Sequence, residues 1–369
     1  MKKKKNYKVI GIMTGTSMDG IDISYCFTNG LNKIKILNEK SYNYPISTQN
    51  SIKKIKLSNL SNKKNTAKYD KNITEIIINY LKKFLKEFHI PKKDIDFISL
   101  SGQTIIHLPK KKFTLQLGNP NFISKYFKLN VVSDFRIKDL LNGGQGAPIG
   151  SYYHKLLINK INPNSAIINL GGVANFSLIN RNTLISSDIG PANAITDDLM
   201  FYFFKKKFDI NGNLASKGKK DIRITELYKK NSFFKKKFPT SLDRNNFYYL
   251  FKKLKKLEPK NALNTSSHFT IHSIIKLTDH KIFKNINEII FTGGGRKNKY
   301  ILKSLRNLRK NIKFSLIDDY KFNGDLLEAQ MFAYIGVRSI KKLILSSQST
   351  TGVKKSISGG KLYKFNYEQ

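Results

Sequence analysis

Small, hydroxyl-bearing and acidic residues follow the first apolar run of the chain in an order that suits phosphate chemistry. The apolar run 9–13 leads into Thr14-Gly15-Thr16-Ser17, and Asp19 and Asp22 stand at the start of a second, alternating run. This pattern predicts a β-hairpin over residues 7–28 with a polar tip. Glycine lets backbone N–H groups approach an anion closely, hydroxyls add donors, and carboxylates suit Mg²⁺, directly or through water. An ordinary surface turn has the same composition.

Two later stretches repeat this plan. Residues 165–179 form an apolar run, the turn Gly171-Gly172 and a second apolar run, as an internal duplication of residues 7–28 would. Residues 288–298 open into Gly293-Gly294-Gly295 before a predicted helix, an arrangement that suits a phosphate or a nucleoside. Three such turns in two similar halves favour a two-lobed ATP-binding cleft. No GxxxxGK(S/T) motif is present, which excludes a P-loop enzyme.

Strands and helices must position these turns. The elements expected besides the two hairpins are a strand over 31–45, a helix over 65–88, strands over 95–100, 113–117 and 131–136, and helices over 299–309 and 324–340. Residues 101–107 are predicted as a polar turn at the carboxyl end of a strand, where ligands of open α/β sheets bind. We therefore expect an α/β fold with an N-terminal lobe over 1–136 and a C-terminal lobe over 137–345. The tail 346–369 is expected to be loose or to pack back on the N-terminal lobe.

The composition bounds the class of protein. A chain of 369 residues is long enough for two lobes with substantial cores. It contains no apolar run of about 18 residues, and Met1–Lys5 lacks the features of a signal peptide, so we expect a cytoplasmic protein with no membrane partner. Cys26 is the one cysteine, which excludes an intramolecular disulfide and a cysteine-based zinc site. Its place on an alternating strand favours a core residue over a nucleophile.

The net charge of +42 has two interpretations. It would suit a nucleic-acid-binding protein. However, the cations are mostly lysines spread along the whole chain, whereas bidentate phosphate and base contacts favour arginine. We therefore expect solvated lysine faces and no nucleic-acid partner. In either case an anionic substrate would be attracted to this surface, more strongly at low salt.

The motifs together resemble the anhydro-N-acetylmuramic acid kinase family, which belongs to the actin, Hsp70 and hexokinase fold class. The resemblance spans nearly the whole chain in family order. It rests on GIMTGTSMDGID (11–22), GQTIIH (102–107), LQLGNP (115–120), SDFR (133–136), GGQGAP (143–148), NLGGVAN (169–175), DIGPAN (188–193), GGGRKN (293–298) and EAQMFA (328–333).

The resemblance implies a fold, a reaction and an assembly. The fold is a two-lobed actin-like ATPase, or ribonuclease H-like, fold with mixed sheets flanked by helices and ATP in the cleft between the lobes. The reaction is phosphorylation of 1,6-anhydro-N-acetylmuramic acid with ATP and Mg²⁺, while water opens the anhydro ring. The product is N-acetylmuramic acid 6-phosphate, an intermediate of peptidoglycan recycling. The resemblance also suggests a homodimer.

The resemblance assigns residues as well. Asp188 is the expected catalytic base, which suits the need to deprotonate the attacking water. The expected sugar contacts are Gln103, Thr104, Arg136 and Glu328. Asp19 and Asp22 are the expected Mg²⁺ ligands, possible also through water. The expected ATP-binding residues are Gly15, Thr16, Ser17, Met18, Asp19, Gly20, Ile21, Asp22, Gly171, Gly172, Asn175, Gly293, Gly294, Gly295 and Asn298.

Several alternatives stay open. Arg136 could instead form a salt bridge with Asp134 or Asp139. The chain departs from the family pattern at Ser101, Ala192 and Thr240, where histidine, glycine and lysine are usual, and this concerns substrate affinity more than fold. A related amino-sugar kinase, or a nucleic-acid-binding protein with a vestigial nucleotide fold, are the rival functions.

Overall fold

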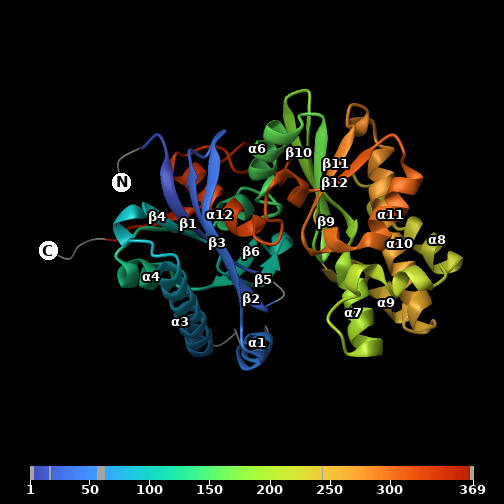
Figure 1. Cartoon of the computed structure of the whole chain (residues 1–369), viewed down its shortest axis with the longest axis horizontal. Helices are drawn as coiled ribbons and strands as arrows, with labels where there is room; N and C mark the ends of the chain where they lie inside the picture. Colours follow the sequence, from blue (N-terminus) through green and yellow to red (C-terminus); the bar gives the residue numbers. More distant parts are fainter. Residues whose placement is uncertain (1–3, 16–17, 56–62, 243, 366–369) are drawn as a thin grey trace. The chain divides into compact units, whose positions relative to one another are not determined.

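The computed structural model describes residues 4–15, 18–55, 63–242 and 244–365. The chain divides into two compact units: unit 1 comprises residues 1–156 with 325–369, and unit 2 comprises residues 157–324 (Figure 1). Each unit is built on its own β-sheet.

The sheet of unit 1 has six strands in the order β13-β7-β4-β1-β2-β3. β1, β2 and β3 are antiparallel neighbours, β4 and β7 continue parallel to β1, and β13 is antiparallel to β7. The strands are β1 (Tyr7–Thr14), β2 (Gly20–Thr28), β3 (Ile34–Asn43), β4 (Phe97–Leu100), β7 (Val131–Ser133) and β13 (Lys361–Tyr363). A separate two-stranded sheet pairs β5 (Gln103–Leu108) with β6 (Phe113–Leu117).

Helices cover this sheet because their apolar stripes match its buried strands. The helices are α1 (Ile46–Lys53), α3 (Lys63–Glu87), α4 (Pro120–Phe127), α5 (Ile137–Leu141), α6 (Ser151–Ile161), which crosses the boundary of the two units, and α12 (Leu327–Ile340). Ile73, Ile77, Leu81 and Phe84 of α3 are buried in the same core as Ile10 and Ile12 of β1 and Ile98 of β4, since they recur at helical spacing.

α12 packs on β1 with almost no space between the two backbones. A Cβ on Gly11 would lie 2.0 Å from the Ala329 carbonyl oxygen and 2.6 Å from the Ala333 nitrogen. The Ser99 hydroxyl of β4 donates to the Phe332 carbonyl at 2.5 Å. The last helix therefore belongs to unit 1, although it is distant from β1 in sequence.

The sheet of unit 2 repeats the plan with five strands in the order β10-β9-β8-β11-β12. β8, β9 and β10 are antiparallel neighbours, and β11 and β12 continue parallel to β8. The strands are β8 (Ser165–Leu170), β9 (Val173–Asn180), β10 (Thr183–Pro191), β11 (Glu288–Thr292) and β12 (Lys313–Leu316). The internal duplication predicted from the two hairpins is confirmed, and the fold is of the predicted α/β, two-lobed class.

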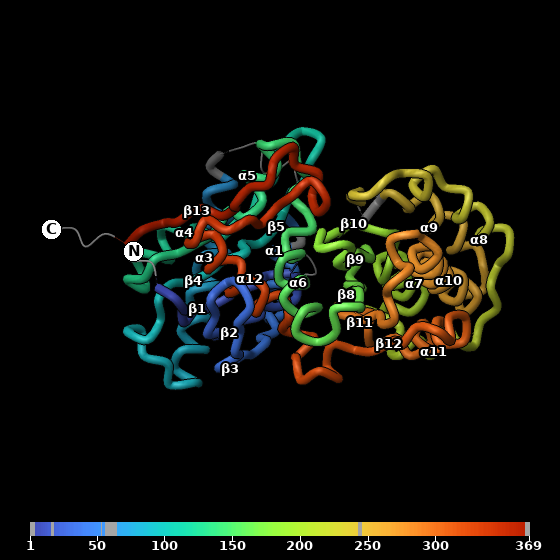
Figure 2. The backbone as a smooth tube through the Cα atoms, turned by 90° about the horizontal axis from the view of Figure 1, so that it is seen from above, coloured from blue at the N-terminus to red at the C-terminus, as the bar shows by residue number. Residues whose placement is uncertain are grey.

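Unit 2 has two apolar cores. The first joins the sheet to α10 and α11, and the second lies among helices α7, α8, α9 and the first half of α10 (Figures 1 and 2). The helices are α7 (Asn193–Phe204), α8 (Ile222–Lys229), α9 (Tyr248–Leu254), α10 (Pro259–Thr278) and α11 (Lys299–Leu308).

The compact units divide after Leu156 and before Asp325, whereas the lobes were expected to divide at 136–137 and 345–346. The helix α12 groups with unit 1 because it packs on β1, β2 and β4. The tail was expected to be loose or to pack back on the N-terminal lobe. Over 346–365, Ser346 bridges Ile357, and β13 joins the sheet of unit 1 beside α4 (Figure 2). Residues 101–107 were expected as a polar turn, whereas Gln103–Leu108 form strand β5.

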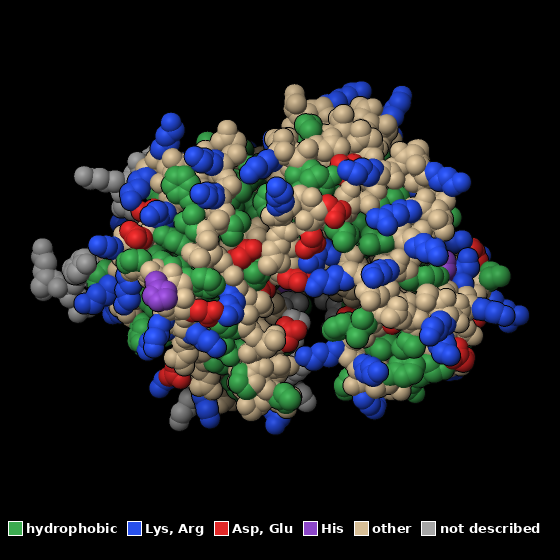
Figure 3. All heavy atoms as spheres, in the orientation of Figure 1, with side chains coloured by type: hydrophobic (Ala, Val, Ile, Leu, Met, Phe, Trp, Pro, Cys, Tyr) green, Lys and Arg blue, Asp and Glu red, His purple; other side chains and the backbone are tan. Residues whose placement is uncertain are grey.

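The described helices include none that is long and apolar enough to span a bilayer. Lysine and arginine side chains are scattered over the visible face of each unit and do not gather into one patch (Figure 3). This distribution fits the interpretation of solvated lysine faces.

The close packing of α12 on β1 predicts the effect of Gly11→Val. Valine suits a strand, so any loss of stability must come from the collision with α12. We expect the free energy of unfolding of unit 1 to fall by about 1–3 kcal/mol, the usual cost of overpacking. Urea denaturation measures it, with Lys35→Thr on exposed β3 as the control. Equal stability of the two variants would contradict the prediction.

Candidate active site

The order of strands brings the predicted site residues of unit 1 to one edge of its sheet. The β1–β2 turn, the end of β4 and the end of β7 all follow the carboxyl ends of mutually parallel strands. A hydrogen bond confirms the meeting of two of these segments, because Gln103 Nε2 donates to the Gly15 carbonyl at 3.0 Å. Residues separated widely in sequence thus share one edge.

The β1–β2 turn is held by its backbone. The Met18 N–H donates to the Gly15 carbonyl at 3.1 Å, and the Tyr44 N–H donates to the Asp19 carbonyl at 2.8 Å. Ile21 is fully buried, and its side chain belongs to the apolar core of unit 1. The predicted contacts Thr16 and Ser17 lie outside the described residues.

The carboxylate of Asp22, after this turn, is influenced by the charges of other carboxylates. Burial raises the pKa of Asp22 to about 6, a hydrogen bond with Ser41 lowers it, and the charges of Glu328 and Asp19 raise it further. A cation nearby would relieve this repulsion. However, the described residues include no group of three or more side chains that could hold a metal ion. The described carboxylates could therefore supply only part of the coordination shell of a Mg²⁺ ion.

Gln103 lies beneath the turn rather than in the open. Its side chain is fully buried, and its Oε1 has no hydrogen-bond partner in the described part of the chain. A buried amide oxygen without a donor costs free energy unless a ligand or water supplies one. Thr104, on the neighbouring position of β5, is half-buried and lies within 3.5 Å of Gln116 Nε2.

The charges of Arg136 and Glu328, both in unit 1, attract each other. The Arg136 guanidinium donates to the Gly146 carbonyl at 2.7 Å, and its charged neighbours are Glu328 and Asp139. Glu328 is reachable by solvent, yet the protein atoms around it raise the pKa of its carboxyl and Arg136 lowers it. Asp139 is occupied, since it accepts from the Gly146 N–H and the Thr351 hydroxyl, both at 2.6 Å.

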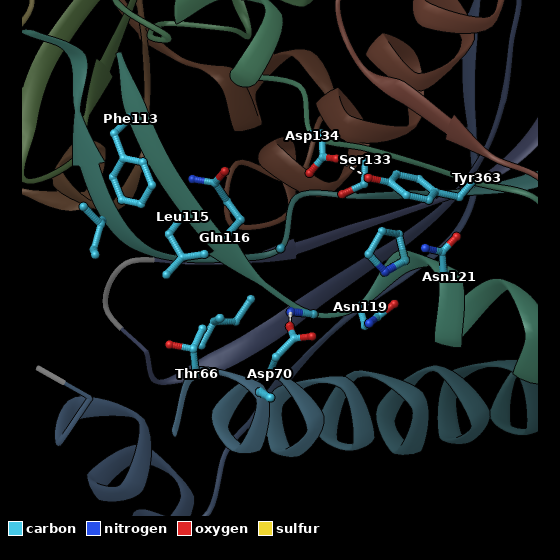
Figure 4. A pocket seen from close by; sticks show the side chains of 16 residues that line it. Thr66, Asp70, Phe113, Leu115, Gln116, Asn119, Asn121, Ser133, Asp134 and Tyr363 are labelled. Carbon is cyan, nitrogen blue, oxygen red and sulfur yellow. Dashed lines mark hydrogen bonds between the residues drawn. The ribbon is translucent and has the colours of Figure 1, made fainter. Parts of the chain in front are cut away.

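A cavity of about 790 Å³ lies beside these segments in unit 1 (Figure 4). Asp70 of α3 and Asp134 after β7 contribute carboxylates, and Asp70 also accepts from the Gly118 N–H at 2.7 Å. The described lining contains no lysine or arginine, and the four predicted sugar contacts are not among its residues, although Gly102 is. Its carboxylate, amide and hydroxyl groups suit a neutral ligand rich in hydroxyls.

In unit 2, a row of polar side chains crosses the sheet and ends at Asp188. Asn169 of β8 is paired with Asn175 of β9, and Asn175 is paired with Asp188 of β10. Residues directly opposite each other in a sheet project on the same face. The sheet therefore places Asn175 beside the predicted base.

Asp188 is held by a loop that is distant in sequence. Its Oδ2 accepts from the Leu242 N–H at 2.7 Å, and its backbone N–H donates to the Thr240 carbonyl at 3.0 Å. The Thr240 N–H donates to the Ser187 hydroxyl at 2.8 Å. The side chain is only 8% exposed, and burial raises the pKa of Asp188 to about 7 while the Leu242 N–H lowers it. A carboxyl with a pKa near neutrality is suited to take a proton.

The two glycine turns of unit 2 meet around Asn193. Its backbone N–H donates to the Gly171 carbonyl at 2.9 Å, and its side chain donates to the Leu170 carbonyl at 3.1 Å. A Cβ on Gly295 would lie 2.7 Å from Asn193 Oδ1. A Cβ on Gly294 would have no atom within 4 Å and one on Gly172 none closer than 3.6 Å, so packing alone does not require glycine there. Close approach of a ligand would.

Arg296 anchors the triple-glycine turn. It is 2% exposed, donates to both carboxylate oxygens of Asp318 at 2.6 and 3.1 Å, and donates to the Gly293 carbonyl at 3.0 Å. A Cβ on Gly293, whose φ is +75°, would lie 2.4 Å from Asn169 Oδ1. Asn298 caps α11, because its side chain accepts from the Ile301 N–H at 3.1 Å.

The departures from the family pattern fit this structure. Ala192 is buried, and its N–H donates to the Gly172 carbonyl at 3.0 Å. Ser101 accepts from the Thr14 N–H at 3.1 Å through its hydroxyl. Thr240 holds Ser187 and Asp188 as described above. The sequence did not reveal that Asp318 pairs with Arg296 or that Leu242 donates to Asp188, because no motif or spacing marks these residues. The one sequence feature that pointed to the first pair is the Gly295-Arg296 dipeptide.

Removal of Asp318 tests the anchor of the triple-glycine turn. Asp318→Ala leaves the buried Arg296 guanidinium without its carboxylate, so we expect unit 2 to lose about 1–3 kcal/mol of unfolding free energy. Asp279→Ala removes the partner of Arg309 from a more exposed pair and serves as the matched control, with an expected loss of about 0–1 kcal/mol. Chemical denaturation measures both, and equal losses would contradict the anchor role.

Known proteins share this pattern over the whole chain. The family model described as anhydro-N-acetylmuramic acid kinase matches residues 7–365. The proteins of that name from Pelagibacter ubique and Gamma-proteobacterium EBAC31A08 are 36% and 35% identical, over 99% and 97% of this chain and 100% of each relative. The one from Rhodopseudomonas palustris is 32% identical, over 96% of this chain and 98% of the relative. The chain belongs to the anhydro-N-acetylmuramic acid kinase family.

Proposed function

We propose that this chain phosphorylates 1,6-anhydro-N-acetylmuramic acid with ATP and opens its anhydro ring with water. The products are N-acetylmuramic acid 6-phosphate and ADP, and the role is in peptidoglycan recycling and amino-sugar catabolism. Membership of the family supports the kinase activity. The observation that carries the ring opening is Asp188, a buried carboxyl with a raised pKa at the carboxyl end of β10.

In the proposed mechanism Asp188 is the general base. Water attacks the anomeric carbon and gives its proton to the Asp188 carboxylate. The bond from that carbon to O6 breaks, and O6 takes the γ-phosphoryl group as ADP leaves. The Leu242 N–H, 2.7 Å from Oδ2, orients the carboxylate, which leaves Oδ1 for the water. Burial supplies the basicity, since an ionised carboxylate is poorly stabilised there.

Glycine turns in both units would hold ATP. In unit 2 these are Gly171, Gly172 and Gly293–Gly295, with Asn175 beside the base; their open space at Gly172 and Gly294 supports close approach of phosphate. The capping role of Asn298 makes its contact with ATP indirect. In unit 1 the turn Gly15–Asp22 would bind phosphate. Asp19 and Asp22 would hold Mg²⁺ through water, and the ion would neutralise phosphate charge.

The sugar contacts are assigned to unit 1. We propose Thr104, Arg136, Glu328 and the unpartnered Oε1 of Gln103 as hydrogen-bonding groups for the sugar. The Arg136 guanidinium suits a carboxylate of the substrate, and the neutral-ligand character of the neighbouring cavity suits its hydroxyl and acetamido groups. We further propose that the protein is cytoplasmic and forms a homodimer. Sedimentation velocity tests the dimer through its mass, and a monomer at micromolar concentration contradicts the dimer.

Labelled water tests the reaction. We expect ¹⁸O from water at the anomeric position of the phosphorylated product. Asp188→Asn should slow turnover by about 10²–10⁴-fold, the usual contribution of a general base. Its melting temperature should stay equal or rise, because asparagine removes a buried charge and can still accept from Leu242. A phosphorylated sugar without the label would indicate a simple amino-sugar kinase.

The pKa of Asp188 predicts the pH profile. The carboxyl must be ionised to accept a proton, so kcat should fall as the pH drops below about 7. In Asp188→Glu we expect residual activity, and we expect the fall of kcat at low pH (the acid limb of the profile) to occur at a different pH. The measurement is kcat at saturating ATP and sugar across the pH range in which the protein stays folded. A rate independent of pH below 7 would argue against Asp188 as the base.

A further inference from the structure

A second cavity, of about 520 Å³, lies wholly in unit 2 and is not used by the proposed reaction. It lies between the end of β10, the second half of α10 and the segment 233–240, and we call it the β10–α10 cavity. Its volume is in the range that holds a small organic molecule. The question is what chemistry its lining would select.

Aromatic rings make up much of that lining. Phe233, Phe234 and Phe238 come from the segment that precedes Thr240. The imidazole of His272 comes from α10, and that of His280 comes from the residues after α10. Phe238 lies 5.2 Å from His280, and Phe234 lies 5.6 Å from His272, measured between ring centroids. Rings presented in this way favour a flat apolar body.

The charge of the lining is positive. Lys236 and Lys276 line the cavity, and the Lys276 ammonium lies 5.2 Å from the Phe234 ring centroid. Among the described lining residues the one carboxylate is that of Asp279, which already accepts from Arg309. The two lysines therefore outnumber the single carboxylate of the described lining, and they favour an anion.

One polar atom of this wall is left without a partner. His272 Nε2 is buried and makes no hydrogen bond in the described part of the chain. Buried polar atoms are nearly always satisfied by protein, water or ligand. His272 therefore has hydrogen-bonding capacity that no described residue uses.

We propose that the β10–α10 cavity binds a flat organic anion, with its ring among the phenylalanines and its carboxylate or phosphate toward Lys236 and Lys276. This site is separate from the proposed ATP and sugar contacts. The occupant also acts on Asp188, because Ile189 and Thr240 line the cavity and flank that residue. Thr240 binds the backbone of Asp188 directly, so a ligand that shifts Thr240 shifts the base. This coupling rests on the proposed function.

Calorimetric titration with 2-naphthoate tests the binding. We expect saturable binding at one site, weakened about tenfold or more in Lys236→Met/Lys276→Met, which corresponds to about 1.4 kcal/mol. Lys281→Met/Lys284→Met removes the same charge from exposed positions outside the lining and should bind like the parent. The neutral 2-naphthalenemethanol should bind at least about tenfold more weakly than the anion. Absence of saturable binding, or equal binding by both double variants, overturns the site.

A kinetic arm tests the coupling separately. Saturating 2-naphthoate should change kcat and move the acid limb of the pH profile in the parent, and should do neither in Lys236→Met/Lys276→Met at the same concentration. Binding without any kinetic effect overturns the coupling and leaves the site. If the chain shows no kinase activity, the proposed function fails, and the calorimetric arm still decides whether the cavity binds the anion.

Discussion

The direction of the strands is the constraint on which the rest of this structure depends. In each unit a central strand is flanked by an antiparallel hairpin on one side and by parallel strands on the other. The hairpin turn and the ends of the parallel strands then have to lie at the same edge. That single geometric rule collects the Gly15 turn, Gln103 and Arg136 in unit 1, and the Gly171 and Gly293 turns in unit 2. The ligand-binding character of α/β sheet edges follows from it.

Burial then decides what the collected side chains can do. Asp188, the proposed base, is carried into the protein by β10 and held by one backbone N–H, and its pKa rises to about 7. More hydrogen bonds to its carboxylate would lower the pKa and weaken the base. Burial and the neighbouring acids also raise the pKa of Asp22, which suits a position near a cation.

Residues of the predicted motifs often support the turns that carry the proposed ligand contacts. Gln103 donates to the Gly15 turn, Asn298 caps α11, and Arg296 fixes the Gly293 turn through Asp318. The glycines divide similarly: Gly293 and Gly295 are required by packing, whereas Gly172 and Gly294 have open space where a Cβ would stand. The glycines therefore serve two needs: the shape of the turn and, in the proposed function, room for phosphate.

The sequence by itself determined the hairpins, most helices, the duplicated plan and the family, because period-2 and helical periodicities, glycine turns and motif order are local properties. Only the tertiary structure decided that α12 belongs with β1, that the tail adds β13, and that Thr240 and Leu242 clamp Asp188. The reason is that these contacts join residues about 50 to 320 positions apart, and no local pattern records which of many apolar faces or free N–H groups will meet. Asp188 was a candidate base from its motif, but the burial that raises its pKa arises only when the chain folds.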